Sequence, residues 1–275
     1  MLGDDVASAN ETIRSRANPL LKRAAGVLAG EETATIPLEG DRLIDDALRA
    51  GVELEIVLVS EERADRAGEL AARGVQVRLV ETELLGRVSR LKTSPGILAL
   101  APTPAPVDLA RLELDESTLL LVASGVADPG NLGALARSAE AFGASAVLVA
   151  RGGASPWNDK ALRGSMGSLL RVPVGFGADP EALAQSLAKR GVRQVGAATR
   201  GGQDARAFDW RGPIALWMGS ETGALPELAK KFERVTISMS GAVESLNVAV
   251  AASLLLYASG RSTQATSATK AKKRG

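Results

Sequence analysis

The sequence predicts an α/β protein with two domains. Short runs rich in Val, Ile and Leu alternate with segments of helical periodicity along the chain, which is the pattern of an α/β fold. A chain of 275 residues is long enough for two separate cores. Between the two halves lies APTPAPVD, which has no periodicity and whose alternating prolines favour an extended spacer. We therefore expect the domain boundary there.

The first half alternates strands and helices. Asn18-Pro19 marks a helix start, whereas Gly51 and Gly74 mark helix ends. The alternation implies a small α/β domain with a largely parallel sheet. Strands are expected at residues 35–38, 54–59, 75–80 and 96–100, and helices at 19–29, 41–50, 60–73 and 82–91.

The second half alternates in the same way and ends in a long apolar run, Leu246–Ala258. This run is too long for a buried strand and suits a buried helix, with Ser245 and Asn247 where an N-cap belongs. A strand end that faces a helix N-terminus is where open α/β sheets bind ligands, although a core helix with a polar cap has the same pattern. The other expected elements are strands at 118–123, 146–150, 192–198, 214–218 and 235–237, and helices at 130–142, 158–170, 179–189 and 225–232.

Two absences narrow the chemistry. The chain has no Cys, which excludes disulfides, thiolate metal sites and cysteine nucleophiles. It has no His, which excludes Ser-His-Asp hydrolysis, imidazole bases and the usual zinc enzymes, so we expect no metal site. No apolar segment reaches the length of a membrane span and the acidic start is unlike a secretory signal, so we expect a cytoplasmic protein without a membrane partner.

Positive charge is concentrated in two places. Arg14, Arg16, Lys22 and Arg23 lie in a stretch without an acid, and so do the cations beyond Gly260. Clustered cations indicate a polyanion partner, or else a solvated face and a disordered tail. The Ser, Thr, Ala and Lys composition of residues 263–275 favours disorder for the tail.

Two strand-to-helix junctions precede the apolar run. In the first, Asn131 lies at the helix mouth and Arg137 lies nearly two turns further, where it either pairs with a carboxylate or faces an anion. The second contains Glu221 and lacks both the P-loop and the dinucleotide fingerprint, which suits a ligand without a polyphosphate. Glu221 is plausible there against a cation or a hydroxyl.

The order and the residue patterns of these junctions match those of a known family. NLGALARSA (131–139), MGSETG (218–223) and ISMSGAVESLNVAVA (237–251) resemble the three motifs of the SpoU (TrmH) class of the SPOUT RNA methyltransferases. SRANPLLK, LEGDRLIDDAL and SPGILAL resemble the L30e-like substrate-binding domain found in that family. The resemblance covers the chain to about Gly260.

The resemblance implies a fold and an assembly. Residues 1–104 would form the L30e-like RNA-binding α/β domain, 105–117 a Pro-rich linker, 118–262 a SPOUT α/β domain and 263–275 a basic tail. The family threads its C-terminal part as a trefoil knot, contrary to the general rule on connectivity, and works as a homodimer. The second and third junctions would form the knot.

The resemblance also implies an activity. Members transfer a methyl group from S-adenosylmethionine to a ribose 2′-hydroxyl of RNA, and we expect 23S rRNA as the substrate. The alternatives are tRNA 2′-O-methylation and a non-catalytic RNA-binding role in ribosome assembly. The matching cofactor positions are Thr199, Gly219, Ile237, Met239 and Leu246, and the matching catalytic positions are Asn131, Arg137, Glu221, Ser245 and Asn247.

Physical chemistry constrains these roles. Deprotonating an arginine at neutral pH costs roughly 9 kcal/mol, so we expect Arg137 to orient the hydroxyl and stabilise developing charge, with Glu221 holding Arg137 or a partner residue. Ser238 stands where the family usually has Pro, which could loosen the cofactor loop. With 3% aromatic residues, RNA contacts should be mostly to phosphates. The expected RNA-binding residues are Arg14, Arg16, Asn18, Lys22, Lys160, Arg163 and Arg171.

Overall fold

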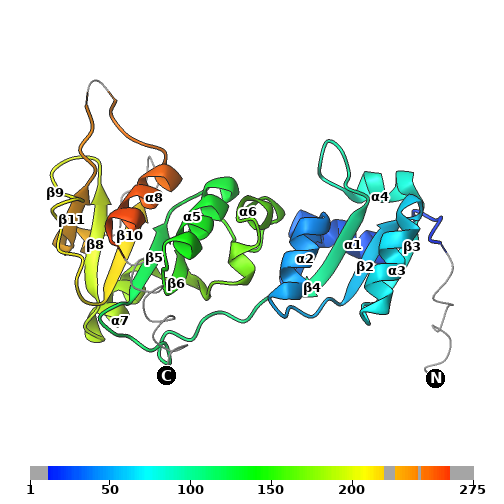
Figure 1. Ribbon diagram of the computed structural model, residues 1–275, viewed down its shortest axis with the longest axis horizontal. Coiled ribbons are helices and arrows are strands. Elements are labelled where there is room, and N and C mark those ends of the chain that lie inside the picture. Colours follow the sequence, from blue (N-terminus) through cyan, green and yellow to red (C-terminus); the bar gives the residue numbers. More distant parts are fainter. Residues whose placement is uncertain (1–11, 220–226, 241–242, 261–275) are drawn as a thin grey trace, which may run out of the picture. The chain divides into compact units, whose positions relative to one another are not determined.

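The computed structural model describes residues 12–219, 227–240 and 243–260, and these residues form two compact units (Figure 1). Unit 1 contains the chain up to Pro104 together with Trp157–Arg163, and unit 2 contains Ala105–Pro156 and the chain from Gly164 onwards. None of the helices in the described ranges is long and apolar enough to cross a membrane.

Unit 1 is a four-stranded sheet packed with helices. Its strands follow the order β1-β4-β2-β3. The elements are α1 (Pro19–Ala29), β1 (Thr35–Glu39), α2 (Asp41–Arg49), β2 (Ile56–Ser60), the 3-10 helix η1 (Glu61–Arg63), α3 (Ala64–Ala72), β3 (Val77–Val80), α4 (Thr82–Val88) and β4 (Ile97–Pro102).

The prediction of a largely parallel sheet in the first domain is wrong. Strand β4 runs antiparallel to both of its neighbours, β1 and β2, and only β2 and β3 are parallel. Alternation of strands and helices establishes the class of fold but not the direction of a strand that enters the middle of the sheet. Here β4 returns between β1 and β2, and its buried Leu98 and Leu100 pack with Leu58 against α1.

Unit 2 is built on a seven-stranded sheet in which every recorded pairing is parallel. The strand order is β7-β6-β5-β10-β8-β11-β9. The strands are β5 (Leu119–Ser124), β6 (Ala146–Ala150), β7 (Val174–Ala178), β8 (Arg193–Ala198), β9 (Gln203–Asp204), β10 (Ile214–Gly219) and β11 (Glu233–Thr236). The helices of unit 2 are α5 (Pro129–Ala141), α7 (Pro180–Lys189) and α8 (Val248–Ala258), with 3-10 helices η2 (Ser168–Leu170) and η3 (Glu227–Lys231). Helix α6 (Asp159–Gly164) groups with unit 1 except for its last residue, Gly164.

The strand order reverses at the centre of this sheet. The chain moves outward from β5 through β6 to β7, then crosses to β8, and β10 later enters between β5 and β8. The carboxyl ends of β8, β10 and β11 consequently lie together at the switch point, where open α/β sheets bind ligands. The expected trefoil knot involves the loops after β10 and β11, and parts of both lie outside the described residues, so the knot stays a prediction.

Helices cover both faces of the sheet. Helices α5 and α8 lie side by side on one face (Figure 1). On the other face, Leu183 and Leu187 of α7 pack with Leu120, Val122 and Trp217 of the central strands. Strands buried on both faces read as continuous apolar runs, and β5 is indeed buried along its whole length.

The predicted spacer at residues 105–117 is largely bound to unit 2. Val107, Leu109, Leu112 and Leu114 pack against its core. Arg190, the C-cap residue of α7, donates hydrogen bonds to the carbonyls of Leu109 and Leu112. The prolines favour an extended spacer, whereas the segment contains turns at residues 109–111 and 116–117 and its apolar side chains pack on unit 2.

The helix predicted over residues 158–170 is interrupted. Helix α6 ends at Gly164, and Met166 and Gly167 then take positive φ angles of 52° and 81°, a left-handed backbone that no α-helix continues through. Gly164 approaches α5 so closely that an added Cβ would lie 3.3 Å from the carbonyl oxygen of Gly130. The helix predicted at 225–232 is the 3-10 helix η3, and residues 225–226 are outside the described ranges.

Candidate cofactor pocket and active site

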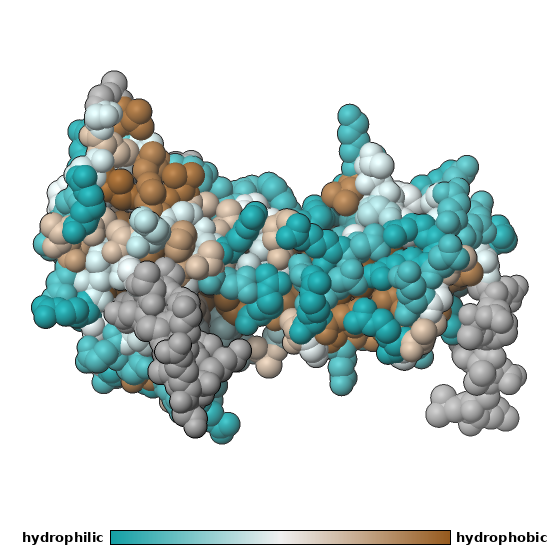
Figure 2. All heavy atoms as spheres, in the orientation of Figure 1, coloured by the Kyte–Doolittle hydropathy of each residue, from teal (hydrophilic) through white to brown (hydrophobic). Residues whose placement is uncertain are grey.

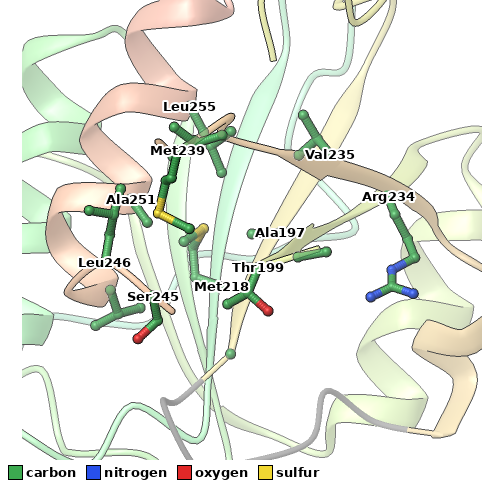
Figure 3. Close-up of a pocket in the computed structure, with 14 residues that line it drawn as sticks. Ala197, Thr199, Met218, Arg234, Val235, Met239, Ser245, Leu246, Ala251 and Leu255 are labelled. Carbon is green, nitrogen blue, oxygen red and sulfur yellow. The ribbon is translucent and has the colours of Figure 1, made fainter. Parts of the chain in front are cut away.

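A cavity of about 310 Å³ lies at the carboxyl ends of β8, β10 and β11 (Figure 3). The N-terminal part of α8 and the loop before it complete its wall. Its lining residues are Ala197, Ala198, Thr199, Met218, Gly219, Arg234, Val235, Ile237, Met239, Ser245, Leu246, Val248, Ala251 and Leu255. The volume and the mainly apolar lining with a few polar groups are typical of small-molecule sites.

The strand ends supply the chemistry of this lining. The thioethers of Met218, at the end of β10, and Met239, after β11, approach each other beside α8 in Figure 3. Thioethers are polarisable and adapt to flat apolar groups. The hydroxyl groups of Thr199 and Ser245 add polar positions on the two sides of the cavity. An apolar slot with separate polar ends fits a nucleoside joined to an amino-acid chain.

Asn247 connects this pocket to the first motif. Its side-chain oxygen accepts hydrogen bonds from the backbone N–H groups of Ala249 (2.9 Å) and Val250 (3.3 Å), so it is the N-cap of α8. Its amide nitrogen donates to the side-chain oxygen of Asn131 at 3.0 Å. The sequence prediction of a polar cap at this helix is confirmed, and the same residue holds α8 to the N-terminus of α5.

Arg137 lies on the exposed side of α5 and does not line the cavity. Within the part of the chain that the structure describes, it makes no ion pair or side-chain hydrogen bond. Of the two alternatives for this residue, the ion pair therefore finds no support inside the described residues. Glu221, its expected partner, falls within residues 220–226, which lie outside them.

The structure gathers the predicted cofactor residues in one place. Thr199, Gly219 and Ile237 line the cavity from the carboxyl ends of three different strands, and Met239 and Leu246 line it from the segment between β11 and α8. Ser245, predicted as catalytic, lies with them. Their roles stay predictions, but their convergence brings together segments that are far apart in sequence.

Met218 and Arg234 line the cavity but are not among the predicted cofactor positions. Met218 is the first residue of the second motif, yet it is 2% exposed and has the pattern of a core residue in a buried strand. Arg234 lies in Glu233–Thr236, where an exposed arginine beside buried Val235 is the ordinary alternation of a strand. Only the position of β11 next to β8 shows that Arg234 borders the cavity.

Ser238 acts on Asp204 of β9. Arg206 donates a 2.9 Å hydrogen bond to the Asp204 carboxylate. This bond, with a smaller contribution from the Ser238 hydroxyl, holds the pKa of Asp204 well below its usual range. That Ser238 loosens the cofactor loop stays a prediction.

Four of the predicted RNA-binding residues lie at the start of unit 1. Asn18 caps α1 by accepting from the N–H of Leu20 at 2.9 Å, so its side chain has a structural role. Arg14 pairs with Glu61 at 2.7 Å. Arg16 and Lys22 are exposed, and the structure records no ion pair for either among the residues it describes. These two are the cations most available to a phosphate.

The other three have intramolecular partners. Arg171 pairs with Glu140 at 2.5 Å, and Arg163 pairs with Asp159 at 2.6 Å. Lys160 also has a partner. Lys160 and Arg163 belong to the segment that groups with unit 1, contrary to their expected place in the second domain. The Arg171–Glu140 pair is partly exposed, whereas Asp159 in the Arg163 pair is buried. Ion pairs open to water are weak, so an RNA phosphate can compete more readily for Arg171 than for Arg163.

A wholly parallel sheet with a ligand cavity at its switch point and a capped helix at the cavity wall defines an α/β enzyme that binds a nucleoside-like cofactor. The comparisons with known proteins agree. The SpoU rRNA Methylase family model matches residues 118–257, and the model of the thiostrepton-resistance methylase N terminus matches residues 10–115.

Relatives match over nearly their whole length. The 23S rRNA (guanosine(2553)-2′-O)-methyltransferase RlmP of Bacillus subtilis is 31% identical over 229 residues, which cover 82% of this chain and 88% of that protein. The S-adenosylmethionine-bound rRNA methyltransferase from Sinorhizobium meliloti superposes with a TM-score of 0.80 at 26% identity, covering 91% of this chain and 97% of that chain. The SpoU methyltransferase AviRb from Streptomyces viridochromogenes, in complex with the same cofactor, has a TM-score of 0.79 at 28% identity, covering 89% and 97%.

The chain belongs to the SpoU rRNA methylase family. It is an RNA methyltransferase whose methyl donor is S-adenosylmethionine.

Proposed function

We propose that this protein methylates a ribose 2′-hydroxyl of 23S rRNA. The observation that carries the proposal is the arrangement of the cofactor cavity and the first motif. Ser245 lines the cavity, and Asn247, two residues later, is bonded to Asn131 at the mouth of α5. Arg137 follows on the exposed side of the same helix. A ribose brought to this junction would lie between the methyl donor and an arginine without a recorded intramolecular partner.

S-adenosylmethionine supplies the methyl group as part of a sulfonium ion. The residues of this chain then have two tasks, to hold the hydroxyl oxygen in line with that methyl group and to stabilise the charge that develops on the oxygen. The guanidinium of Arg137 suits both tasks because it donates several hydrogen bonds in a fixed plane. The guanidinium acts here as a hydrogen-bond donor and not as the base, so the proton of the hydroxyl passes to solvent.

A homodimer is part of the proposal. Helix α8 is buried along one side through Ala252 and Leu256, yet it exposes Val250 (49%), Leu254 (44%) and Tyr257 (69%). Tyr257 packs edge-to-face on Phe142, the C-cap residue of α5, with ring centroids 5.8 Å apart. Hydrophobic side chains also gather over α8 in Figure 2. An exposed apolar patch of this kind marks an interaction site.

The second copy would also complete the active site. Arg137 is on α5, which packs beside α8, and its side chain is exposed without a partner among the described residues. A second copy seated on the α5–α8 face would cover this arginine and exclude water from it. Excluding water strengthens the electrostatic contribution of a fixed cation.

Unit 1 would hold the RNA through contacts of Arg16 and Lys22 with phosphates. Because the proposed substrate is rRNA, the proposal also includes a cytoplasmic location. The test compares transcripts of 23S rRNA, 16S rRNA and tRNA as methyl acceptors. We expect transfer to 23S rRNA alone. Transfer to tRNA alone would support the second expected substrate instead, and cofactor binding without transfer to any RNA would favour a role in ribosome assembly.

A further inference from the structure

Arg234 is the one charged side chain among the described residues that line the cofactor cavity. It lies on β11, where its Cα pairs with Gly196 of β8. Its Nη2 atom donates a 3.2 Å hydrogen bond to the carbonyl of Arg200. Arg200 is four residues after Gly196 and lies past the end of β8. The side chain therefore runs towards the carboxyl end of the sheet, where the cavity opens.

The guanidinium keeps most of its hydrogen-bonding capacity. An arginine has five N–H donors, and within residues 12–219, 227–240 and 243–260 the carbonyl of Arg200 is the one acceptor recorded for Arg234. No carboxylate in those ranges pairs with it. Figure 3 shows the guanidinium on the Thr199 side of the cavity, whereas Ser245 lies on the other side.

The positive charge of Arg234 lies in the cavity that would bind S-adenosylmethionine, which is itself positively charged. S-adenosylmethionine carries positive charge on its sulfonium and on its ammonium group, so an unneutralised guanidinium in the same cavity would repel it. The single anionic group of the molecule is the carboxylate of its methionyl part. Arg–carboxylate pairs form two parallel N–H···O bonds and are among the stronger polar contacts.

The position argues against a role in RNA binding. The ribose must approach the junction of Ser245, Asn247 and Asn131, and Ser245 lies on the opposite side of the cavity from Arg234 in Figure 3. The methyl group must face that junction, and the methionyl carboxylate is several bonds away from it. The far side of the cavity is therefore the natural place for the carboxylate.

We propose that Arg234 binds the methionyl carboxylate of the cofactor and thereby sets its orientation. This proposal rests on the binding of S-adenosylmethionine and adds a specificity-determining residue that the family motifs do not contain. Because the product S-adenosylhomocysteine keeps the carboxylate, Arg234 contributes to the binding of both the methyl donor and the product.

Calorimetric titration with two ligands tests the proposal. S-adenosylhomocysteine carries the carboxylate, whereas 5′-methylthioadenosine has the same nucleoside and sulfur without the amino-acid part. Arg234→Met should weaken binding of S-adenosylhomocysteine by about 10- to 100-fold and leave binding of 5′-methylthioadenosine unchanged within about twofold. Unchanged binding of 5′-methylthioadenosine would also show that the variant has a folded cavity.

Two further variants sharpen the test. Arg200→Met removes an exposed neighbouring charge that does not line the cavity, and it should leave both affinities unchanged. Arg234→Lys keeps the charge but not the planar fork, and it should recover part of the lost affinity.

Three results would overturn the proposal, and a fourth would contradict the cofactor assignment on which it rests. Equal losses of affinity for both ligands in Arg234→Met would show that Arg234 only shapes the cavity. An equal loss of affinity for S-adenosylhomocysteine in Arg200→Met would show that any nearby positive charge has the same effect. A loss of RNA affinity without a loss for S-adenosylhomocysteine would make Arg234 a phosphate contact. Failure of the unaltered protein to bind S-adenosylhomocysteine would contradict the cofactor assignment itself, which is a different failure.

Discussion

At the scale of single residues, Asn247 joins two helices because one side chain has two partners. Its oxygen caps α8 and its nitrogen reaches Asn131, a residue 116 positions away in sequence. The cap keeps the wall of the cofactor cavity in place, because Val248 and Ala251 of α8 line that cavity. The two tasks can be separated by substitution.

Asn247→Asp keeps the oxygen that caps the helix but removes the amide donor to Asn131. We expect its stability to stay within about 0.5 kcal/mol of the unaltered protein, whereas Asn247→Ala should lose about 1 kcal/mol or more. Both variants should lose methyl transfer. Chemical denaturation and a tritium-transfer assay measure the two effects, and full activity in Asn247→Asp would remove the contact with Asn131 from the mechanism.

Arg137→Ala should lower the rate of methyl transfer by at least about 100-fold, because it removes the donor that stabilises charge on the ribose oxygen. The affinity for S-adenosylhomocysteine should change by less than about twofold, since Arg137 does not line the cavity. Single-turnover kinetics and calorimetry measure these quantities. A variant that keeps its rate but binds the cofactor weakly would assign Arg137 to the pocket instead.

Candidate site residues inside the three motifs can be predicted from the sequence, whereas candidate residues outside the motifs cannot. Asn131, Ser245 and Asn247 stand out because polar side chains at helix mouths are recognisable locally. Arg234 does not, because its role depends on which strand lies beside it and not on its own surroundings in sequence. Three predicted RNA contacts, Arg14, Arg163 and Arg171, are engaged in ion pairs that sequence patterns do not reveal.

At the scale of elements, Glu140 ties α5 to η2. Its carboxylate accepts hydrogen bonds from the Ser168 hydroxyl (2.6 Å) and from Arg171 (2.5 and 2.8 Å). The bonds from Arg171, and then the bond from Ser168, hold the pKa of Glu140 below its usual range. This tie supports the turn at Met166 and Gly167 that interrupts the predicted helix.

The lowered pKa makes this tie dependent on pH. A carboxyl whose pKa is lower in the folded state stabilises the fold above its ordinary value of about 4.3, and the stabilisation disappears as pH falls through the lowered folded value. Glu140→Gln should therefore reduce the free energy of unfolding at pH 7 by about 1 kcal/mol, allowing for partial exposure. The difference should shrink below about pH 4.

Glu83→Gln is the matched control, because Glu83 forms an exposed pair with Arg87 at 3.6 Å on α4. That substitution should change the free energy of unfolding by less than about 0.5 kcal/mol at either pH. Denaturant titrations at pH 7 and pH 3 measure both variants. A pH-independent loss in Glu140→Gln would mean that packing, and not charge, connects α5 with η2.

Most elements are predictable from periodicity, and the exceptions have physical causes. The strand β7 is missed because Gly175 and Gly177 dilute its apolar pattern, and the two-residue β9 is too short to show one. The predicted parallel direction of β4 is wrong because a strand's direction depends on its neighbours in the sheet and not on its own residues. The helix break after Gly164 includes a positive φ angle at Met166. A methionine in the sequence gives no indication of such a backbone conformation, whereas a glycine would.

At the scale of the whole molecule, the exposed face of α8 predicts the assembly. Leu254→Arg places a charge in the middle of the apolar patch, so light scattering should change from twice the chain mass of 28.4 kDa to the mass of one chain. Methyl transfer should be lost with the dimer. Phe176→Arg alters another exposed aromatic residue, on β7, and should leave the dimer intact. A dimer that survives Leu254→Arg would contradict the proposed interface.

The central claim is that the protein methylates the ribose of 23S rRNA. Its most direct test is mass spectrometry of nucleosides from 23S rRNA transcript incubated with the protein and S-adenosylmethionine that carries a trideuterated methyl group. We predict one trideuterated 2′-O-methylnucleoside, absent when Arg137→Ala replaces the unaltered protein. Label on a base, or label in tRNA and none in 23S rRNA, would contradict the account.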